Sequence, residues 1–212
     1  MPGSQSCDGT ELSLFSSLLA QHLKGISTLD EGQVNLLWGH YQLLVKWNST
    51  INLTAIRNLD EAVRKHYFES IFLGTHLPKG PLHIADVGSG AGFPGIPVAV
   101  LRSDCHVTLI ESNHRKAAFL REATRGWANA AVVPKRAETL DAAFDWLIAR
   151  AAGWKGVLAL IPSLAPSVAL LLGPDDCYNA LKTRHIQWEE PIPSPWGGDT
   201  LLVMGRSVSR GT

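Results

Sequence analysis

The spacing of hydrophobic residues divides the chain into two stretches. Up to about residue 77, apolar side chains recur at intervals of three and four, which predicts amphipathic helices. Further helices are expected over residues 11–24 and 61–77, with a loop over residues 48–59. Thr28 and Glu31 form a candidate capping box for the central helix. The clearest periodic set on that helix comprises Val34, Leu37, Trp38, Tyr41, Leu44 and Val45.

Beyond a Pro-Lys-Gly-Pro segment at residues 78–81, hydrophobic residues gather in short runs instead. Segments long enough for crossover helices separate the first five runs, so these strands should be parallel, with helices on both faces. Only a segment rich in Pro and Gly separates the last two runs, which favours an antiparallel hairpin at the sheet edge. The seven predicted strands cover residues 82–87, 106–111, 130–133, 144–149, 167–172, 184–189 and 200–205.

The sequence therefore predicts an α/β protein in two parts. Residues 1–80 form an N-terminal helical extension, and residues 81–212 form a Rossmann-like domain. The sheet of that domain should be doubly wound, seven-stranded and mostly parallel, with its last strand antiparallel.

Composition excludes several classes of protein. Of the 212 residues, 45% are hydrophobic and 18% are charged, which is typical of a globular chain and excludes a mainly disordered one. Nineteen basic residues balance nineteen acidic ones, so we do not expect the broad positive surface of a strong non-specific nucleic-acid binder. Pro162 and Pro166 interrupt the uncharged stretch at residues 156–174, which favours a buried helix and strand over a membrane span.

The cysteines indicate the compartment. Cys7, Cys105 and Cys177 lie far apart and form no CxxC pair, so we expect neither a metal site nor a disulfide framework. This usage favours a reducing, cytoplasmic environment. The first residues also lack the basic cluster and apolar run of a secretory signal.

The most informative segment is a glycine-rich loop, with the sequence DVGSGAGFPG at residues 86–95. It follows the first predicted strand and precedes a predicted helix. Glycines at this junction let a ligand approach the backbone, and the helix N-terminus presents free N–H groups. Glu111 ends the next strand about twenty residues later, where a carboxylate can accept hydrogen bonds from both ribose hydroxyls. The pattern predicts a nucleotide-like cofactor.

Two cofactor classes compete for this loop. Gly90 to Gly95 matches GxGxxG, which is found in dinucleotide-binding oxidoreductases. Asp86 favours S-adenosylmethionine, because its carboxylate would repel a pyrophosphate by of order 1 kcal/mol but attract a sulfonium or ammonium group. The pattern D-x-G-x-G-x-G resembles motif I of class I methyltransferases. Asp86 could alternatively be a helix-capping or structural acid, and Glu111 a solvated strand end.

Several longer motifs extend beyond the glycine loop. They are DVGSGAGFPGIPVAVL, LIESNHRKAAFL, Arg136 to Glu138, Ala149 to Ala151, Trp47-Asn48, Asn52-Leu53-Thr54 and His66-Tyr67-Phe68-Glu69-Ser70. Together these motifs resemble one family, the bacterial small-subunit ribosomal RNA guanine-N7 methyltransferases, also called glucose-inhibited division protein B. The resemblance covers about residues 34–151 and implies S-adenosyl-L-methionine as cofactor and small-subunit (16S) ribosomal RNA, in a ribosomal particle, as partner. Membranes and metals are not implied.

The resemblance and the loop together imply a set of site residues. Phe93 could instead pack in the core, and Arg150 could be a surface ion-pair partner of Asp145 or Glu138. His66 is expected to be a core or interface histidine, outside the site. The expected cofactor-binding residues are Asp86, Gly88, Ser89, Gly90, Gly92, Phe93, Glu111, Ser112, Asn113, Ala137, Glu138 and Arg150. The expected substrate-binding residues are Arg150, Arg136 and Lys135.

The implied reaction needs no catalytic acid or base, because neutral guanine already carries a lone pair on N7. One departure from the family concerns Leu172-Gly173-Pro174, where many relatives have Lys-Gly, so a basic residue is missing from the expected mouth of the site. Two alternatives therefore stay open beside the RNA methyltransferase. They are a class I methyltransferase acting on a small molecule and a ribosome assembly factor that retains the cofactor pocket.

Overall fold

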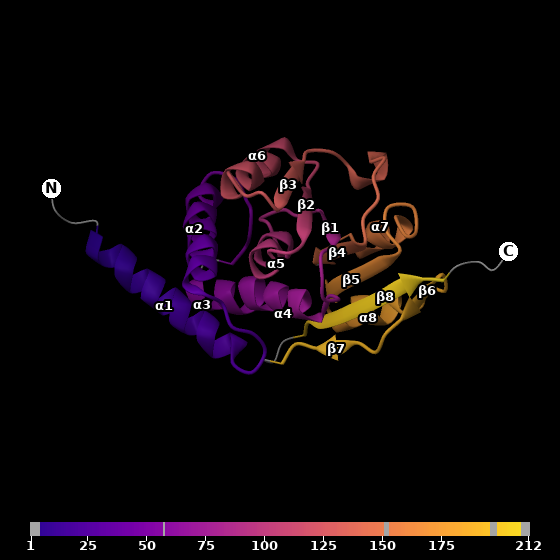
Figure 1. The fold of residues 1–212 in the computed structure, drawn as a ribbon, viewed down its shortest axis with the longest axis horizontal. Coiled ribbons are helices and arrows are strands. Elements are labelled where there is room, and N and C mark those ends of the chain that lie inside the picture. The colour runs from indigo at the N-terminus through magenta and orange to yellow at the C-terminus, as the bar shows by residue number, and fades with distance from the viewer. Residues whose placement is uncertain (1–4, 57, 151–152, 196–198, 209–212) are drawn as a thin grey trace.

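A computed structural model describes residues 5–56, 58–150, 153–195 and 199–208. Its centre is a sheet in the order β3-β2-β1-β4-β5-β8-β6, with the short β7 paired to β8 (Figure 1). Strands β1 to β5 pair in parallel, and β8 pairs antiparallel with β5, β6 and β7. The strands are β1 (His83–Val87), β2 (His106–Ile110), β3 (Ala130–Val133), β4 (Trp146–Arg150), β5 (Ser167–Leu172), β6 (Ile186–Trp188), β7 (Ile192–Pro193) and β8 (Leu201–Ser207).

This architecture confirms the predicted α/β fold with a mostly parallel sheet and an antiparallel last strand. The seven predicted strands are all present, with bounds within two residues of the expected ones. The structure adds the two-residue β7 and places β8 between β5 and β6, so that β6 forms the sheet edge. The internal position of β8 agrees with its burial, because Leu202 and Val203, which point to opposite faces, are 1% and 0% exposed.

The part of the chain before the sheet is helical. Its last helix is interrupted by a π-helical segment, η1. The N-terminal elements are α1 (Gln5–Leu23), α2 (Glu31–Asn48), α3 (Leu59–Ala62), η1 (Val63–Phe68) and α4 (Glu69–His76). The later elements are α5 (Gly95–Leu101), α6 (His114–Ala123), the 3₁₀ turn η2 (Ala137–Thr139), α7 (Trp154–Ala159) and α8 (Pro174–Ala180).

The capping box of α2 differs from the predicted pair. Asp30, rather than Thr28, accepts a hydrogen bond from the backbone N–H of Gln33 at 2.8 Å, and the Gln33 side chain accepts from the Asp30 N–H at 3.0 Å. Asp30 directly precedes the helix, so its carboxylate reaches the free N–H groups of the first turn. The box with Thr28 and Glu31 was wrong.

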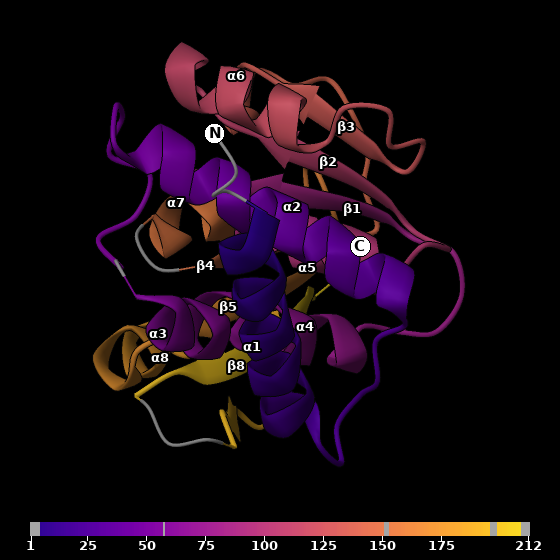
Figure 2. The same cartoon turned by 90° about the vertical axis from the view of Figure 1, so that its left-hand side faces the viewer.

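The sheet separates two hydrophobic cores. Ile84 of β1 and Ile148 of β4 face the core that contains α1, α2, α4, α5 and α6. Their neighbours Ala85 and Leu147 face the other core, with α7 and α8. Figure 2 looks onto the first side, where α1 and α2 lie in front of α4 and α5. The N-terminal helices thus share one core with the sheet. No helix among the described residues is long and apolar enough to cross a membrane.

Candidate functional site

The carboxyl ends of the parallel strands bring the predicted cofactor residues together. The glycine loop follows β1, Glu111 follows β2, and Arg150 is the last residue of β4. Because parallel strands end at one edge of a sheet, these segments meet there. The backbone N–H groups of Gly88 and Ser89 donate to the Ile110 carbonyl at 2.9 and 3.1 Å, which fastens the loop to the end of β2.

The glycines of the loop serve two purposes. Gly88 and Gly90 have φ angles of +75° and +56°, which side-chain-bearing residues rarely adopt. A Cβ atom at Gly88 would meet no atom within 4 Å, so the space beside this backbone is open to a ligand. A Cβ atom at Gly92 would instead lie 2.5 Å from the Ile96 side chain, and one at Gly95 would lie 2.5 Å from Asp86 Oδ2. Gly88 and Gly90 therefore leave room for a ligand, whereas Gly92 and Gly95 permit close packing.

Asp86 lies in β1 beneath the loop and is fully buried. Its Oδ2 accepts a hydrogen bond from the Gly95 N–H at 3.0 Å, so the alternative of a structural acid at the start of α5 holds for this oxygen. Its Oδ1 has no hydrogen-bond partner among the described residues. Burial raises the pKa of the carboxyl to about 7, against the lowering effect of the Gly95 N–H. The Ser89 hydroxyl donates to the backbone carbonyl of Asp86 at 3.0 Å rather than to Oδ1. An unpartnered buried carboxylate oxygen suits a cationic ligand.

Glu111 connects the loop with the start of α6. It is 8% exposed, and its Oε2 accepts from the Gly90 N–H at 3.0 Å while its Oε1 accepts from the Asn113 N–H at 2.7 Å. Each carboxylate oxygen keeps further acceptor capacity for a ligand hydroxyl. Asn113 is the N-cap of α6, since its Oδ1 accepts from the N–H groups of Arg115 and Lys116, and Ser112 between them is exposed.

The segment after β3 lies at the same edge of the sheet. Ala137 is buried at the start of the η2 turn, whereas the neighbouring Glu138 is exposed. Lys135 and Arg136, which were expected to contact substrate, are also exposed. The structure therefore leaves two cations of this segment open to a large ligand.

Arg150 is held by the N-terminal helices. Its Nη2 donates to Glu69 Oε2 at 2.9 Å, and its Nη1 bonds to Nδ1 of His66. The alternative in which Arg150 pairs with Asp145 or Glu138 is wrong: the Asp145 carboxylate accepts from the backbone N–H of His83 at the opposite end of β1. The Arg150 side chain is 19% exposed, so its guanidinium is neither in the core nor free in solvent.

His66 is a buried histidine at the interface between the N-terminal helices and the sheet, as expected from the sequence, and it contacts two residues of the predicted site. Its ring stacks on Phe93 with 4.5 Å between centroids and 17° between planes, so Phe93 packs against the helical extension. Its Nε2 lies 2.8 Å from the Thr54 hydroxyl. Burial, and then the charge of Arg150, lower the pKa of His66 to about 3, so the ring is neutral. His66 lies in the π-helical segment, a distortion that is frequent at functional sites.

A second buried histidine contacts the glycine loop from α2. His40 Nε2 lies 2.9 Å from the Ala91 carbonyl, which can only accept, so this nitrogen carries the proton. His40 Nδ1 therefore accepts from the Tyr67 hydroxyl at 2.8 Å. Burial lowers the pKa of His40 to about 4. No sequence motif singled out this residue. Two histidines of the N-terminal helices thus contact the glycine loop, His40 at the Ala91 carbonyl and His66 at the Phe93 ring.

Fold and loop together define the class of protein. The structure superposes on a SAM dependent methyltransferase from Aquifex aeolicus with a TM-score of 0.55 and 14% identity, over 70% of this chain and 93% of that one. It also superposes on precorrin-6y C5,15-methyltransferase from Geobacter metallireducens with a TM-score of 0.50 and 12% identity, over 65% and 86% of the two chains. At these identities the likeness concerns the fold. The chain therefore has the fold of the class I methyltransferases.

Sequence comparisons specify the family. The family model for rRNA small subunit methyltransferase G matches residues 33–164. The chain is 46% identical over 189 residues to ribosomal RNA small subunit methyltransferase G of Xanthomonas campestris pv. campestris (strain B100), which covers 85% of this chain and 84% of that protein. Identity to the protein of that name from Nitrosococcus oceani is 39% over 171 residues, or 78% and 76% of the two chains. This chain belongs to the rRNA small subunit methyltransferase G family, which confirms the resemblance of its motifs.

Proposed function

We propose that this protein transfers a methyl group from S-adenosylmethionine to N7 of a guanine in small-subunit ribosomal RNA. The observation that carries the proposal is the hydrogen bond from the Gly90 N–H of the glycine loop to Glu111, at the carboxyl ends of the parallel strands. The chain that forms it has relatives named rRNA methyltransferases. The acceptor, a guanine N7, follows from the family resemblance. The assembled small subunit in the cytoplasm is the proposed setting, because a chain of zero net charge is poorly suited to binding naked RNA.

The residues at the site fit the cofactor. The unpartnered Oδ1 of Asp86 suits the cationic end of the methionine part, and the open space beside Gly88 admits that part against the backbone. Glu111 has acceptor capacity for the ribose hydroxyls. Ala137 and Glu138 would flank the adenine, with Ser112 and Asn113 on the ribose side. Bound S-adenosylmethionine supplies an electrophilic methyl group on its sulfonium.

The protein's contribution to catalysis is positioning. The N7 atom of neutral guanine attacks with its own lone pair, so no residue needs to remove a proton. His66 and His40 are correspondingly neutral, with both ring nitrogens of each engaged in hydrogen bonds. What the chain must do is align N7 with the methyl carbon and exclude water from the space between them. We therefore assign no catalytic acid or base.

Contacts to RNA are proposed for the cations around this edge. Arg150 is partly exposed next to the loop, and Lys135 and Arg136 are exposed after β3. Such side chains serve mainly to place an RNA by its phosphates, while the reacting base is splayed out of its stack. Leu172, at the position where many relatives have Lys, is buried and adds no charge. Arg150 is consequently the central cation of the proposed RNA surface.

The test is transfer of labelled methyl from S-adenosylmethionine to unmodified small ribosomal subunits, with their extracted RNA as a parallel acceptor. A single N7-methylguanine, mapped by N7-specific chain cleavage, is the expected product, with more transfer to the particle than to free RNA. Cofactor binding without transfer to either acceptor would overturn the proposed acceptor and favour a small-molecule substrate. Transfer to free RNA with a steep salt dependence would overturn the preference for the particle.

A further inference from the structure

The N-terminal motifs that resemble the family, Asn52-Leu53-Thr54 and His66 to Ser70, contribute no residue to the cofactor site described above. The structure nevertheless joins them in one chain of hydrogen bonds that ends at Arg150. We infer that His66, supported by Thr54 and Glu69, is a positioning residue that orients the Arg150 guanidinium for RNA. This inference rests on the proposed function and adds residues to it.

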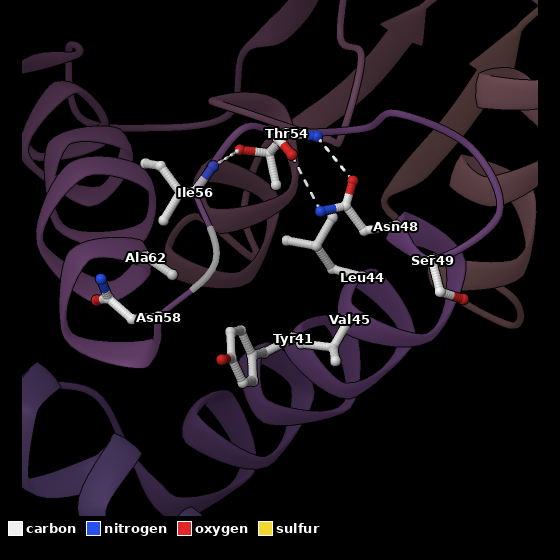
Figure 3. A pocket seen from close by; sticks show the side chains of 9 residues that line it. All are labelled: Tyr41, Leu44, Val45, Asn48, Ser49, Thr54, Ile56, Asn58 and Ala62. Atoms are coloured by element: carbon white, nitrogen blue, oxygen red, sulfur yellow. Dashed lines mark hydrogen bonds between the residues drawn. The ribbon is translucent and has the colours of Figure 1, made fainter.

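The chain of bonds begins at the end of α2. The Asn48 side chain accepts from the backbone N–H groups of Leu53 and Thr54 at 2.9 and 3.1 Å, and its Nδ2 donates to the Thr54 carbonyl at 3.0 Å. The Thr54 hydroxyl in turn accepts from the Ile56 N–H at 3.1 Å (Figure 3). Figure 3 shows the two bonds between Asn48 and Thr54 crossing from the helix to the loop beside it, and the bond between Ile56 and Thr54 within that loop. Thr54 is therefore fixed through both its backbone and its hydroxyl.

The direction of the next bonds follows from the chemistry of the groups. A guanidinium has only donors, so Nδ1 of His66 must accept from Arg150. The neutral ring then carries its proton on Nε2 and donates it to the Thr54 hydroxyl at 2.8 Å. Only one tautomer of His66 satisfies both neighbours. Protonated His66 would present an N–H to the Arg150 N–H groups, which is consistent with the lowered pKa of the ring.

Glu69 fixes the second arm of the guanidinium. Its Oε2 accepts from Arg150 Nη2 at 2.9 Å, and its side chain is 7% exposed. Glu69 lies three residues after His66 across the boundary between η1 and α4, so one helix presents both acceptors to Arg150. A guanidinium held at both Nη atoms keeps a fixed plane, and its other N–H groups have no partner among the described residues.

This arrangement distinguishes positioning from catalysis and from simple packing. The lone pair of His66 is used by Arg150, so the ring has no basic nitrogen for the RNA. Its stacking on Phe93 is a separate, apolar contact that a phenyl ring can replace. The variant His66→Phe therefore removes the two hydrogen bonds and preserves the ring, and His66→Asn restores an acceptor near the position of Nδ1. His83→Phe is the matched control, because His83 is exposed at the first residue of β1, at the opposite end of that strand from the glycine loop.

The decisive experiment is a double-mutant cycle of His66→Phe and Arg150→Ala, measured as kcat/KM for small ribosomal subunits. His66→Phe should lower this constant by about 10- to 100-fold in the natural background, and by about twofold or less when Arg150 is already Ala. His66→Asn should recover most of the loss, and His83→Phe should cause none. Calorimetry with S-adenosylhomocysteine and thermal unfolding of each variant verify that folding and the cofactor site persist.

The outcomes separate this inference from the function on which it rests. If losses multiply in the double variant, or if His66→Asn is as impaired as His66→Phe, His66 does not act through Arg150 and the inference is overturned while the methyltransferase function stands. If His66→Phe unfolds, the same cycle of Thr54→Val with Arg150→Ala decides, because Val removes the hydroxyl that accepts from His66 Nε2 and leaves the ring in place. If the unaltered protein forms no N7-methylguanine, the proposed function fails first and the inference fails with it.

Discussion

Replacing Asp86 with Asn should stabilise the cofactor-free protein at alkaline pH and weaken its binding of the cofactor. Asp86 is fully buried, and burial raises the pKa of its carboxyl from 3.8 to about 7. Asn offers the Gly95 N–H a carboxamide oxygen in place of the carboxylate oxygen that it now contacts. It does so without a charge that must be buried. The ionised Asp86 of the wild-type protein therefore carries a desolvation cost that Asn lacks.

The magnitude follows from the two pKa values. Because the folded value is the higher one, the folded protein binds more protons than the unfolded chain between them. The stabilisation from this proton binding is complete below the unfolded pKa of 3.8 and is lost as the pH rises through about 7. Integrated from pH 5 to pH 8, the loss in the wild-type protein is about 2.5 kcal/mol. Asn does not titrate, so the variant escapes this loss.

Urea unfolding of both proteins at pH 5, 6, 7 and 8 measures the difference. The free energy of unfolding of Asp86→Asn, minus that of the wild type, should rise with pH by about 2.5 kcal/mol across this range. The histidines His40 and His66 are present in both proteins, so their titration cancels in the difference. If the difference in unfolding free energy stayed constant with pH, the raised pKa of the buried Asp86 carboxyl would be refuted. At pH 8 the same variant should bind S-adenosylhomocysteine about tenfold more weakly, as expected if Asp86 faces a cation.

Three further predictions concern the loop and its supports. Gly95→Ala should destabilise the protein by about 1–3 kcal/mol in urea unfolding, because the added Cβ would lie 2.3 Å from Leu109 Cδ2. Gly39→Ala, whose Cβ would meet nothing within 4 Å, should instead stabilise by about 0.5–1 kcal/mol, and equal effects would contradict the packing argument. The His66 ring should show one neutral tautomer and no titration by NMR between pH 5 and 8, since its pKa is lowered to about 3. Glu111→Gln should weaken cofactor binding by calorimetry about tenfold, because an amide nitrogen would face one of two N–H donors; unchanged affinity would remove Glu111 from the site.

The sheet could be predicted from sequence because its signals are local. A buried parallel strand is a short apolar run between polar segments, and such runs identified seven strands, including β5, where Ser167–Leu172 is buried throughout. β7 was missed because a strand of two residues has no pattern. The cap of α2 was misassigned because Thr28 with Glu31 and Asp30 with Gln33 show the same spacing of three. Only the exact start of the helix decides between them.

In the candidate site, too, the local features could be predicted from sequence and the contacts between distant residues could not. The glycine loop and Glu111 were predictable because strand, turn and helix follow one another within a short stretch of chain. The partners of Arg150 were not, since His66 and Glu69 are 84 and 81 residues away and meet it only in the folded molecule. The interruption of the helix by η1 likewise has no sequence signal that we could identify. The spacing of His66 and Glu69 in the family motif was the available clue to their shared target.

The two neutral histidines connect the N-terminal helices to the predicted site. The proposed reaction needs no proton transfer, so it depends on how rigidly the glycine loop and the cation proposed to contact RNA are held. His40 holds the Ala91 carbonyl of the loop, and His66 holds both the Phe93 ring and Arg150. Both histidines come from helices whose apolar faces are buried against the sheet, so their positions are set by the same core that sets β1 and β4. Burial keeps each ring neutral, and a neutral ring with one fixed tautomer can donate on one side and accept on the other. In the proposed reaction the extension thereby sets the positions of the glycine loop and of Arg150, while the strand ends supply the groups proposed to contact cofactor and RNA.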